Sequence, residues 1–251
     1  MSFKGYRLFL AVNFVIFFAV QLYSGFTYSI SDEHVYFYMG NIVAGGLLPY
    51  RDFFYAHPPL QLVLYGLLFR IAPYNFIFLK LLSIGLTIVN SILLYLIVRK
   101  DFGEKVGILA SIIALWTPTI LFNASFEYGL TIGMSLFLFG LLNENRGFWQ
   151  GLSFLASSMY RYHFIFLVAG YYAYKVAVKD YDFIRKGIWF LNFLLAINLT
   201  LIFIVPNYLD YAILYHINKP HVPMQTFETL STIIKINYLV FILPLVLLLF
   251  Y

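Results

Sequence analysis

Residues 31–59 separate two apolar stretches and have the sequence SDEHVYFYMGNIVAGGLLPYRDFFYAHPP. The interval begins with adjacent carboxylates, Asp32 and Glu33, and ends with His57 before two prolines. Serine and aspartate are favoured N-caps, so Ser31 or Asp32 indicates a helix start. Glycine accepts the left-handed conformation that ends many helices, so Gly45 and Gly46 indicate its end. The pattern predicts a helix over residues 31–43.

Apolar side chains recur at helical spacing in this segment, at Val35, Met39, Ile42 and Val43. The helix is therefore expected to lie on a membrane surface. Residues 60–72 are apolar but too short to span a bilayer, and Arg70 lies near their end. We expect a second interfacial helix there.

Composition indicates a membrane protein. The chain has 251 residues, of which 62% are hydrophobic and 11% charged. A soluble domain carries roughly 25% charged residues, so this chain lacks a sufficient polar surface. The net charge of +5 comes without a basic polar patch, so nucleic acid is not an expected partner. The absence of cysteine excludes disulfides and thiolate metal sites.

Eight apolar segments are candidate membrane spans. Residues 8–28 are about long enough to cross roughly 30 Å of hydrocarbon, and we interpret them as a retained first helix. The others are residues 75–98, 107–121, 128–142, 147–159, 162–177, 187–205 and 231–251. We predict an all-α integral membrane protein with about eight transmembrane helices. Two outer interfacial helices lie between the first and second spans, in a single domain over residues 1–251 whose outer catalytic loop is 30–74.

The distribution of basic residues predicts the orientation. Short loops rich in Lys and Arg stay in the cytoplasm. If residues 60–72 do not cross, ten basic residues fall on one side and six on the other. The chain is therefore expected in the plasma membrane with a cytoplasmic N-terminus. The ten are Lys4, Arg7, Arg99, Lys100, Lys105, Arg146, Lys175, Lys179, Arg185 and Lys186, and the six are Arg51, Arg70, Lys80, Arg161, Lys219 and Lys235.

This arrangement brings ionisable residues to the outer side. Ionisable groups at helix ends near a bilayer often mark a site. A base among them could remove a proton while cations hold a phosphate leaving group. The alternative is structural, since loop charges must lie on some face and Asp32 can serve as an N-cap. The residues concerned are Asp32, Glu33, His57, Glu127, Arg161, His216 and Lys219.

The order of these motifs resembles the GT-C glycosyltransferases. The Asp-Glu pair after the first span, the helix that ends in glycine, PYRDF and HPPL are similar to the branch of protein O-mannosyltransferases and lipid A aminoarabinose transferases. The resemblance covers residues 1 to about 225 and includes ASFEYGL, GFWQGLSFLASSMYRYH and LYHINKP. Arg161 stands where many relatives have lysine. The family's soluble C-terminal domain is absent from this sequence, which leaves a minimal member, a subunit with a partner or a truncated reading frame as alternatives.

The resemblance implies transfer of a mannose-like hexose from a polyprenyl or dolichyl phosphate to an acceptor hydroxyl outside the cytoplasm. The acceptor is a protein, lipid or glycan. Asp32 would be the general base and Glu33 its helper, and the reaction would invert the anomeric carbon. Arg161 and Lys219 are the candidates for binding the donor phosphate.

Four further residues are candidates for substrate binding: Arg51, His57, Glu127 and His216. Some family members bind a divalent metal ion, for which Glu127, His57 and His216 are candidate ligands. Arg51 could instead form an ion pair with Asp52 that holds the loop, and His57 could be a loop residue fixed by the prolines. A multispan transporter and a non-catalytic membrane subunit are the alternative functions.

Overall fold

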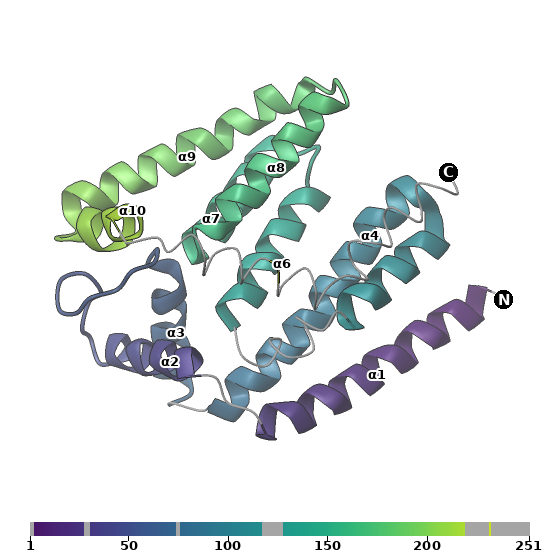
Figure 1. The fold of residues 1–251 in the computed structure, drawn as a ribbon, viewed down its shortest axis with the longest axis horizontal. Helices are drawn as coiled ribbons and strands as arrows, with labels where there is room; N and C mark the ends of the chain where they lie inside the picture. Colours follow the sequence, from purple (N-terminus) through teal and green to yellow (C-terminus); the bar gives the residue numbers. More distant parts are fainter. Residues whose placement is uncertain (1–2, 28–30, 74–75, 117–127, 219–230, 232–251) are drawn as a thin grey trace.

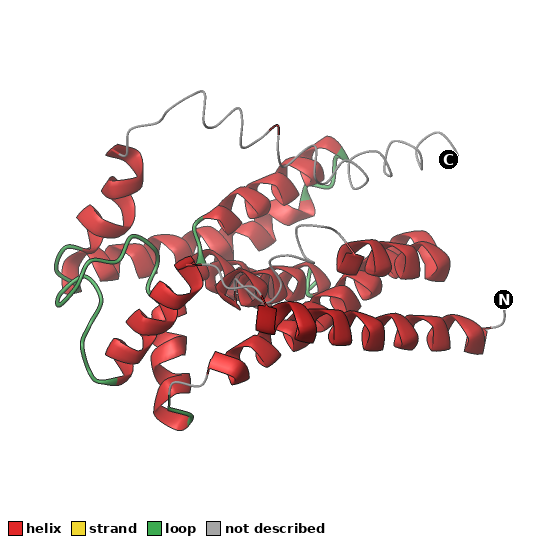
Figure 2. Ribbon diagram, turned by 60° about the horizontal axis from the view of Figure 1, so that its bottom comes forward, coloured by secondary structure: helices red, strands yellow, loops and turns green. Residues whose placement is uncertain are grey.

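The computed structural model describes residues 3–27, 31–73, 76–116, 128–218 and 231. In these ranges the chain is helical, and Figure 2 shows helices joined by loops, the longest at one end of the molecule. The only extended pairing in the described ranges is an isolated bridge between Pro49 and Phe53. The elements are α1 (Phe3–Thr27), α2 (Ser31–Ala44), α3 (Leu60–Ile71), α4 (Phe76–Trp116), α6 (Tyr128–Leu142), α7 (Gly147–Tyr160), α8 (His163–Ala177), α9 (Asp182–Ile204), η1 (Leu209–Leu214) and α10 (Tyr215–Asn218). The predicted all-helical architecture is confirmed for these residues.

Helix α4 folds back on itself at Gly103, whose φ of 84° is not helical. The Oγ atoms of Ser91 and Ser111, 20 residues apart, are within 2.6 Å of each other. Twenty residues of unbroken helix would separate them by about 30 Å. The described parts of the two predicted segments 75–98 and 107–121, which are residues 76–98 and 107–116, therefore form a hairpin. Helix continues past Arg99 and Lys100, which were expected in the connecting loop.

Two described helices are long and apolar enough to cross a bilayer, Ile77–Trp116 and Asp182–Ile204. Helices α6, α7 and α8 have 15, 14 and 15 residues. At 1.5 Å per residue they are about 21–23 Å long, shorter than the roughly 30 Å hydrocarbon core. The predicted set of eight spans is thus not confirmed, and its last member, residues 231–251, lies almost entirely outside the described ranges.

The helix pair α2–α3 forms where the sequence predicts it, but with a different buried face. Val35 is 46% exposed, whereas Phe37 is fully buried. The buried stripe is set by the close contact between the two helices. A Cβ at Gly40 would lie 2.5 Å from Tyr65 Cβ, and a Cβ at Gly66 would lie 2.6 Å from Val43 Cγ1. Only glycine permits this separation.

Helix α9 begins five residues earlier than the predicted start at Gly187. It starts at Asp182, inside the charged segment 178–186 that was interpreted as a loop. A carboxylate in the first turn stabilises a helix N-terminus. Asp182 also pairs with Lys186 one turn later, at 2.7 Å. These local charges extend the helix beyond its apolar part.

Three groups of buried side chains hold the helices together. One joins α2, α3, the start of α4 and η1 around Phe37, Tyr65 and Tyr208. Another lies between α6, α7, α8 and α9 around Phe154, and a third attaches α1 to α4 through Phe17. Figure 1 shows α2, α3 and α10 at one end of the molecule, with the N-terminus and the α8–α9 turn towards the other.

Candidate functional site

The segment between α2 and α3 is a well-defined loop. Gly46 has a φ of 100°, which ends α2 as the sequence predicts. The Leu48 N–H donates to Asp52 Oδ2 at 2.8 Å, and the Asp52 N–H donates to Leu48 O at 3.0 Å. A tight turn follows, in which the Tyr50 N–H donates to Phe53 O at 2.9 Å.

Tyr50 anchors this loop in the interior. It is 1% exposed and has a φ of 68°, an uncommon conformation for a bulky residue. Its hydroxyl donates to His57 O, and its carbonyl accepts a hydrogen bond of 3.1 Å from Asn207 Nδ2. Burial raises the pKa of Tyr50 far above its usual value, so the hydroxyl stays protonated and continues to donate. The backbone at His57 is thereby fixed.

His57 meets Arg161, which lies 104 residues later in the chain. Arg161 Nη1 is 2.7 Å from His57 Nε2 and donates to the Tyr36 hydroxyl at 3.2 Å. The Tyr36 hydroxyl is also 3.0 Å from His57 Nε2. A guanidinium only donates, so His57 Nε2 is the acceptor and the proton of the neutral ring is assigned to Nδ1. This triad of Tyr36, His57 and Arg161 is the centre of the candidate site.

Arg161 is positioned by the break between α7 and α8. Helix α7 ends at Tyr160, and Arg161 adopts an extended conformation before α8 begins. The residue is only 7% exposed. Its Cζ lies 4.4 Å from the centre of the Tyr36 ring, a cation–π geometry. A buried guanidinium from the junction of α7 and α8 is therefore held against α2.

His216 completes the cluster from the C-terminal side. Its ring stacks on that of His57 with centroids 5.4 Å apart. His216 Nε2 bonds to Ala56 O, and because a carbonyl only accepts, that nitrogen carries the hydrogen. The neighbouring Tyr208 hydroxyl donates to Asn198 Oδ1 at 2.7 Å and is 2.8 Å from the Tyr162 hydroxyl. The segment after α9 is thus fixed beside the loop.

Of the predicted site residues, the structure brings His57, Arg161 and His216 together. Arg51 instead forms a bidentate ion pair with Asp52. Its Nε donates to Asp52 Oδ1 and its Nη2 donates to Asp52 Oδ2, both at 2.9 Å. The structural role considered for Arg51 is therefore confirmed, and its substrate-binding role stays a prediction. The side chains of Asp32 and Glu33, in the first turn of α2, lie outside what the structure describes, as do Glu127 and Lys219 entirely.

The sequence reasoning missed several tyrosines that build the site, Tyr36, Tyr50, Tyr162 and Tyr208. The chain has 22 tyrosines, and composition alone does not distinguish these four from the others. Spacing offered one signal, since Tyr36 follows Asp32 by four residues and so shares its helix face. Nothing in the sequence indicates that Tyr208 packs on Tyr50, at 5.2 Å between ring centroids.

The Nε2 atoms of His57 and His216 both have hydrogen-bond partners, so neither is available to a metal ion as the rings lie. His57 Nε2 faces a guanidinium, and His216 Nε2 donates to a carbonyl. A cation at either nitrogen would displace these partners, and a guanidinium repels it. Among the described residues there is no group of three His, Asp or Glu side chains that could hold a metal ion. Glu127 lies outside the described ranges, and metal binding stays a prediction.

The arrangement is chemically suited to binding an anion. It presents a buried guanidinium, whose contacts include His57 and Tyr36, at the end of an apolar helical bundle. Arginine pairs with carboxylates and phosphates through directed hydrogen bonds. No family model, no curated protein and no solved structure matches the chain, so its likeness to the GT-C glycosyltransferases rests on its own residues.

Proposed function

We propose that the chain is a membrane glycosyltransferase that moves a mannose-like hexose from a polyprenyl or dolichyl phosphate to an acceptor hydroxyl. The observation that carries this proposal is the contact of Arg161 with His57 and Tyr36. It puts a buried cation beside α2, the helix that begins with Asp32 and Glu33. Position 32 precedes Tyr36 by one helical turn, so a carboxylate and a guanidinium would meet across one substrate.

In the proposed reaction the carboxylate of Asp32 removes the proton from the acceptor hydroxyl, and Glu33 helps to position the acceptor. The acceptor oxygen attacks the anomeric carbon from the face opposite the phosphate. The bond between that carbon and the phosphate oxygen breaks, and lipid phosphate leaves with inversion at the sugar. Arg161, together with Lys219, stabilises the charge that develops on the leaving group. No step requires a metal ion.

His57 acts as a positioning residue in this proposal. His57 Nε2 accepts from Arg161 Nη1 and so helps to hold the guanidinium in one orientation. The ring is itself held through its backbone by Tyr50 and by stacking on His216. The guanidinium is thereby oriented before substrate arrives, which lowers the reorganisation needed for catalysis.

In this proposal the chain lies in the plasma membrane with its site outside the cytoplasm, and the apolar character of the helices supports the membrane location. Two of the described helices are long and apolar enough to cross a bilayer. Most large side chains on their surfaces are apolar and exposed, for example Leu195 at 62% and Phe203 at 85%. Hydrocarbon around the bundle would cover these groups, and a lipid-linked donor would reach the site from the same phase.

The test is sugar transfer by membranes supplied with polyprenyl-phosphate hexoses, with wild type compared with Asp32→Asn. Loss of a general base typically costs 10²–10⁴-fold in rate. Asp101→Asn is the matched control, because Asp101 is an exposed carboxylate next to the Gly103 fold-back, far from α2. We expect it to retain wild-type transfer. Equal transfer by wild type and Asp32→Asn would remove Asp32 from the mechanism.

A further inference from the structure

Four aromatic side chains gather at the end of α7 and α9 that is remote from Arg161. They are Phe148 and Trp149 on α7, and Trp189 and Phe193 on α9. The Phe148 ring lies 5.4 Å from Trp149, 5.5 Å from Trp189 and 5.5 Å from Phe193. Yet Phe148 is 46%, Trp149 51% and Trp189 43% exposed. These rings form an ordered aromatic cluster that the described part of the chain leaves uncovered.

Two glycines of α7 set the position of this cluster. A Cβ at Gly147 would lie 3.1 Å from Lys186 Cα, and one at Gly151 would lie 2.8 Å from Phe190 N. Spaced four residues apart, they allow the two helix backbones to approach closely, as small residues do between membrane helices. The rings that flank the glycines are therefore brought into contact, and the cluster is a fixed feature of the α7–α9 packing.

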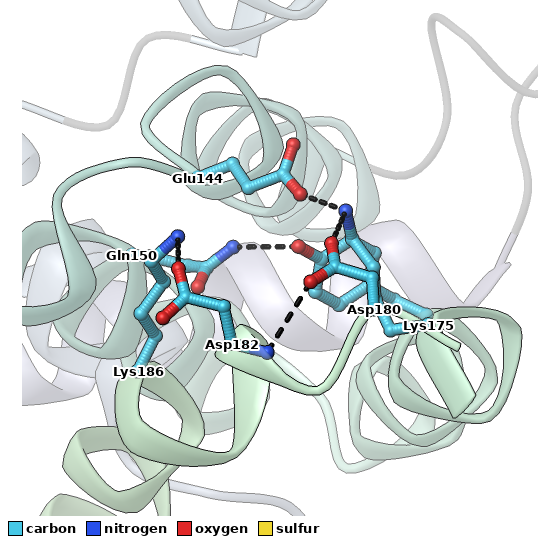
Figure 3. A network of polar contacts seen from close by, with 7 residues as sticks. Glu144, Gln150, Lys175, Asp180, Asp182 and Lys186 are labelled. Carbon is cyan, nitrogen blue, oxygen red and sulfur yellow. Dashed lines mark hydrogen bonds and ion pairs between the residues drawn. The ribbon is translucent and has the colours of Figure 1, made fainter. Parts of the chain in front are cut away.

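The polar groups around the cluster leave an excess of positive charge. Figure 3 shows Lys175 with Glu144 and Asp180, and Lys186 with Asp182. Hydrogen bonding to Lys175 holds the pKa of Asp180 below its usual value, so that carboxylate stays charged in its pair. The three nearby acids are thus all engaged with these two lysines.

Two arginines at the same end form no ion pair with an acid among the residues that the structure describes. Arg146 immediately precedes the first turn of α7, and Arg185 lies on α9 four residues before Trp189. Both are exposed, and neither guanidinium forms an ion pair within the described ranges. Position 185 and Trp189 are four residues apart, so Arg185 lies on the face of α9 that carries Trp189.

We propose that this surface binds the headgroup of an anionic phospholipid. Tryptophan rings prefer the membrane–water interface, and the exposed rings of Trp149 and Trp189 would lie among the upper acyl chains. Arg146 and Arg185 would bind the phosphate and the further negative charge of the headgroup. The inference rests on the membrane location in the proposed function, but not on glycosyl transfer. By the distribution of basic residues, the lipid belongs to the cytoplasmic leaflet.

The chain carries its own probes for this site. It has three tryptophans, so Trp116→Phe leaves only Trp149 and Trp189 to emit. We would reconstitute this variant in phosphatidylcholine nanodiscs that contain a small, equal fraction of acyl-brominated phosphatidylglycerol or acyl-brominated phosphatidylcholine. Bromine quenches tryptophan on contact. A juxtamembrane basic residue favours anionic lipid by about fivefold, so the brominated phosphatidylglycerol should quench more strongly at equal amounts.

The double variant Arg146→Gln/Arg185→Gln should lose this preference and quench equally with both lipids. Lys100→Gln/Lys105→Gln is the matched control, because it removes the same charge at the Gly103 fold-back and should keep the preference. Circular dichroism of each variant checks that it is folded. Equal quenching of the Trp116→Phe parent by both lipids, or a preference that survives the arginine changes, would overturn the proposal. Absence of quenching by either lipid would also overturn it, because the rings of Trp149 and Trp189 would then not lie among acyl chains.

Failure of this proposal is distinguishable from failure of the proposed function. Quenching needs no sugar donor and does not involve Asp32. Equal quenching of the Trp116→Phe parent by both lipids, with intact sugar transfer, would remove only the lipid site, whereas Asp32-independent transfer would leave the lipid result unaffected.

Discussion

Arg161 binds two residues that lie far from it in the sequence, and its chemistry explains why it is arginine. The planar group stacks on the Tyr36 ring while one nitrogen donates to both His57 and the Tyr36 hydroxyl. An ammonium is a compact point charge that cannot stack and donate in this fork geometry. Lysine is therefore not an equivalent residue here, although both carry the same charge.

We expect Arg161→Lys to lower the thermal stability of the detergent-solubilised protein. A hydrogen bond to a charged group contributes about 1.5–3 kcal/mol, and at least one would be lost. The measurement is Tm by circular dichroism. Arg51→Lys is the control, since that guanidinium is exposed and pairs with its neighbour Asp52 at the surface. It should leave Tm nearly unchanged, and an equal loss in both variants would contradict a special role for the buried arginine.

The ionisation of Asp52 should make the stability of the loop depend on pH. Hydrogen bonds from Arg51 and from the Leu48 N–H lower the pKa of the Asp52 carboxyl below its usual value. The unfolded loop therefore takes up a proton more readily than the folded loop. The stabilisation is fully present above about pH 4 and is lost as the pH falls through the depressed pKa of the folded state. Between neutral pH and about pH 5 the contribution of Asp52 to the stability of the loop should stay constant.

Hydrogen–deuterium exchange at the Leu48 amide, corrected for the intrinsic rate at each pH, measures this effect. Protection should be constant above about pH 4 and decrease below it. In Asp52→Asn the carboxylate is absent, so the acid-dependent change should disappear. Protection in the wild type that falls as the pH rises would contradict the assigned cause.

At the scale of elements, the site depends on how closely α2 and α3 pack. Gly40 faces Tyr65 and Gly66 faces Val43 at distances that no Cβ tolerates. These contacts bury Phe37 and Phe69 between the helices, where their rings meet edge to face at 6.3 Å. The pair then brings Tyr36 of α2 to the loop before α3, where its hydroxyl lies 3.0 Å from His57 Nε2.

Gly40→Ala should destabilise the protein by about 1–3 kcal/mol, because the added methyl group overpacks the α2–α3 contact. Gly85→Ala is the matched control in α4, where an added Cβ meets nothing within 4 Å. Alanine is favoured over glycine in a helix by up to about 1 kcal/mol, so this variant should be as stable as wild type or more so. Comparison of Tm values in one detergent tests both, and equal effects would contradict the packing argument.

For the whole molecule, the two ends of the helical bundle differ in their polar chemistry. One end has the Tyr36–His57–Arg161 triad beneath a loop closed by Tyr50 and Asn207. The other has a network of paired acids and lysines (Figure 3), together with exposed arginines and a cluster of aromatic rings on α7 and α9. Such a division is expected if the two ends face different compartments.

Single cysteines can test this orientation, because the chain has no cysteine of its own. Asp52→Cys should react with a membrane-impermeant maleimide added to intact cells, since its loop is expected outside. Lys100→Cys should react only after the membrane is opened, since short basic loops stay in the cytoplasm. Labelling at position 100 but not at position 52 would invert the proposed orientation.

The sequence by itself determined the helical class, the glycine at which α2 ends, and the bounds of α2, α3, α6 and α7 to within one or two residues. These features are local, because apolar periodicity, glycine and helix length act over a few neighbouring residues. It also predicted that His57, Arg161 and His216 lie on one side. The start of α9 was misplaced because the pairing of Asp182 with Lys186 outweighed the apolar boundary.

Only the tertiary structure decided which side chains meet. Arg161 donates to a histidine that lies 104 residues away in the sequence. The Tyr50 carbonyl accepts a hydrogen bond from Asn207, which lies 157 residues later in the chain. No local pattern specifies such contacts, because they follow from how α2, α7 and the segment after α9 pack against one another. The same packing turned Phe37 inwards instead of Val35 and brought the rings of α7 and α9 together through Gly147 and Gly151. Close packing, which depends on the shapes of distant surfaces, is what the linear pattern of residues does not contain.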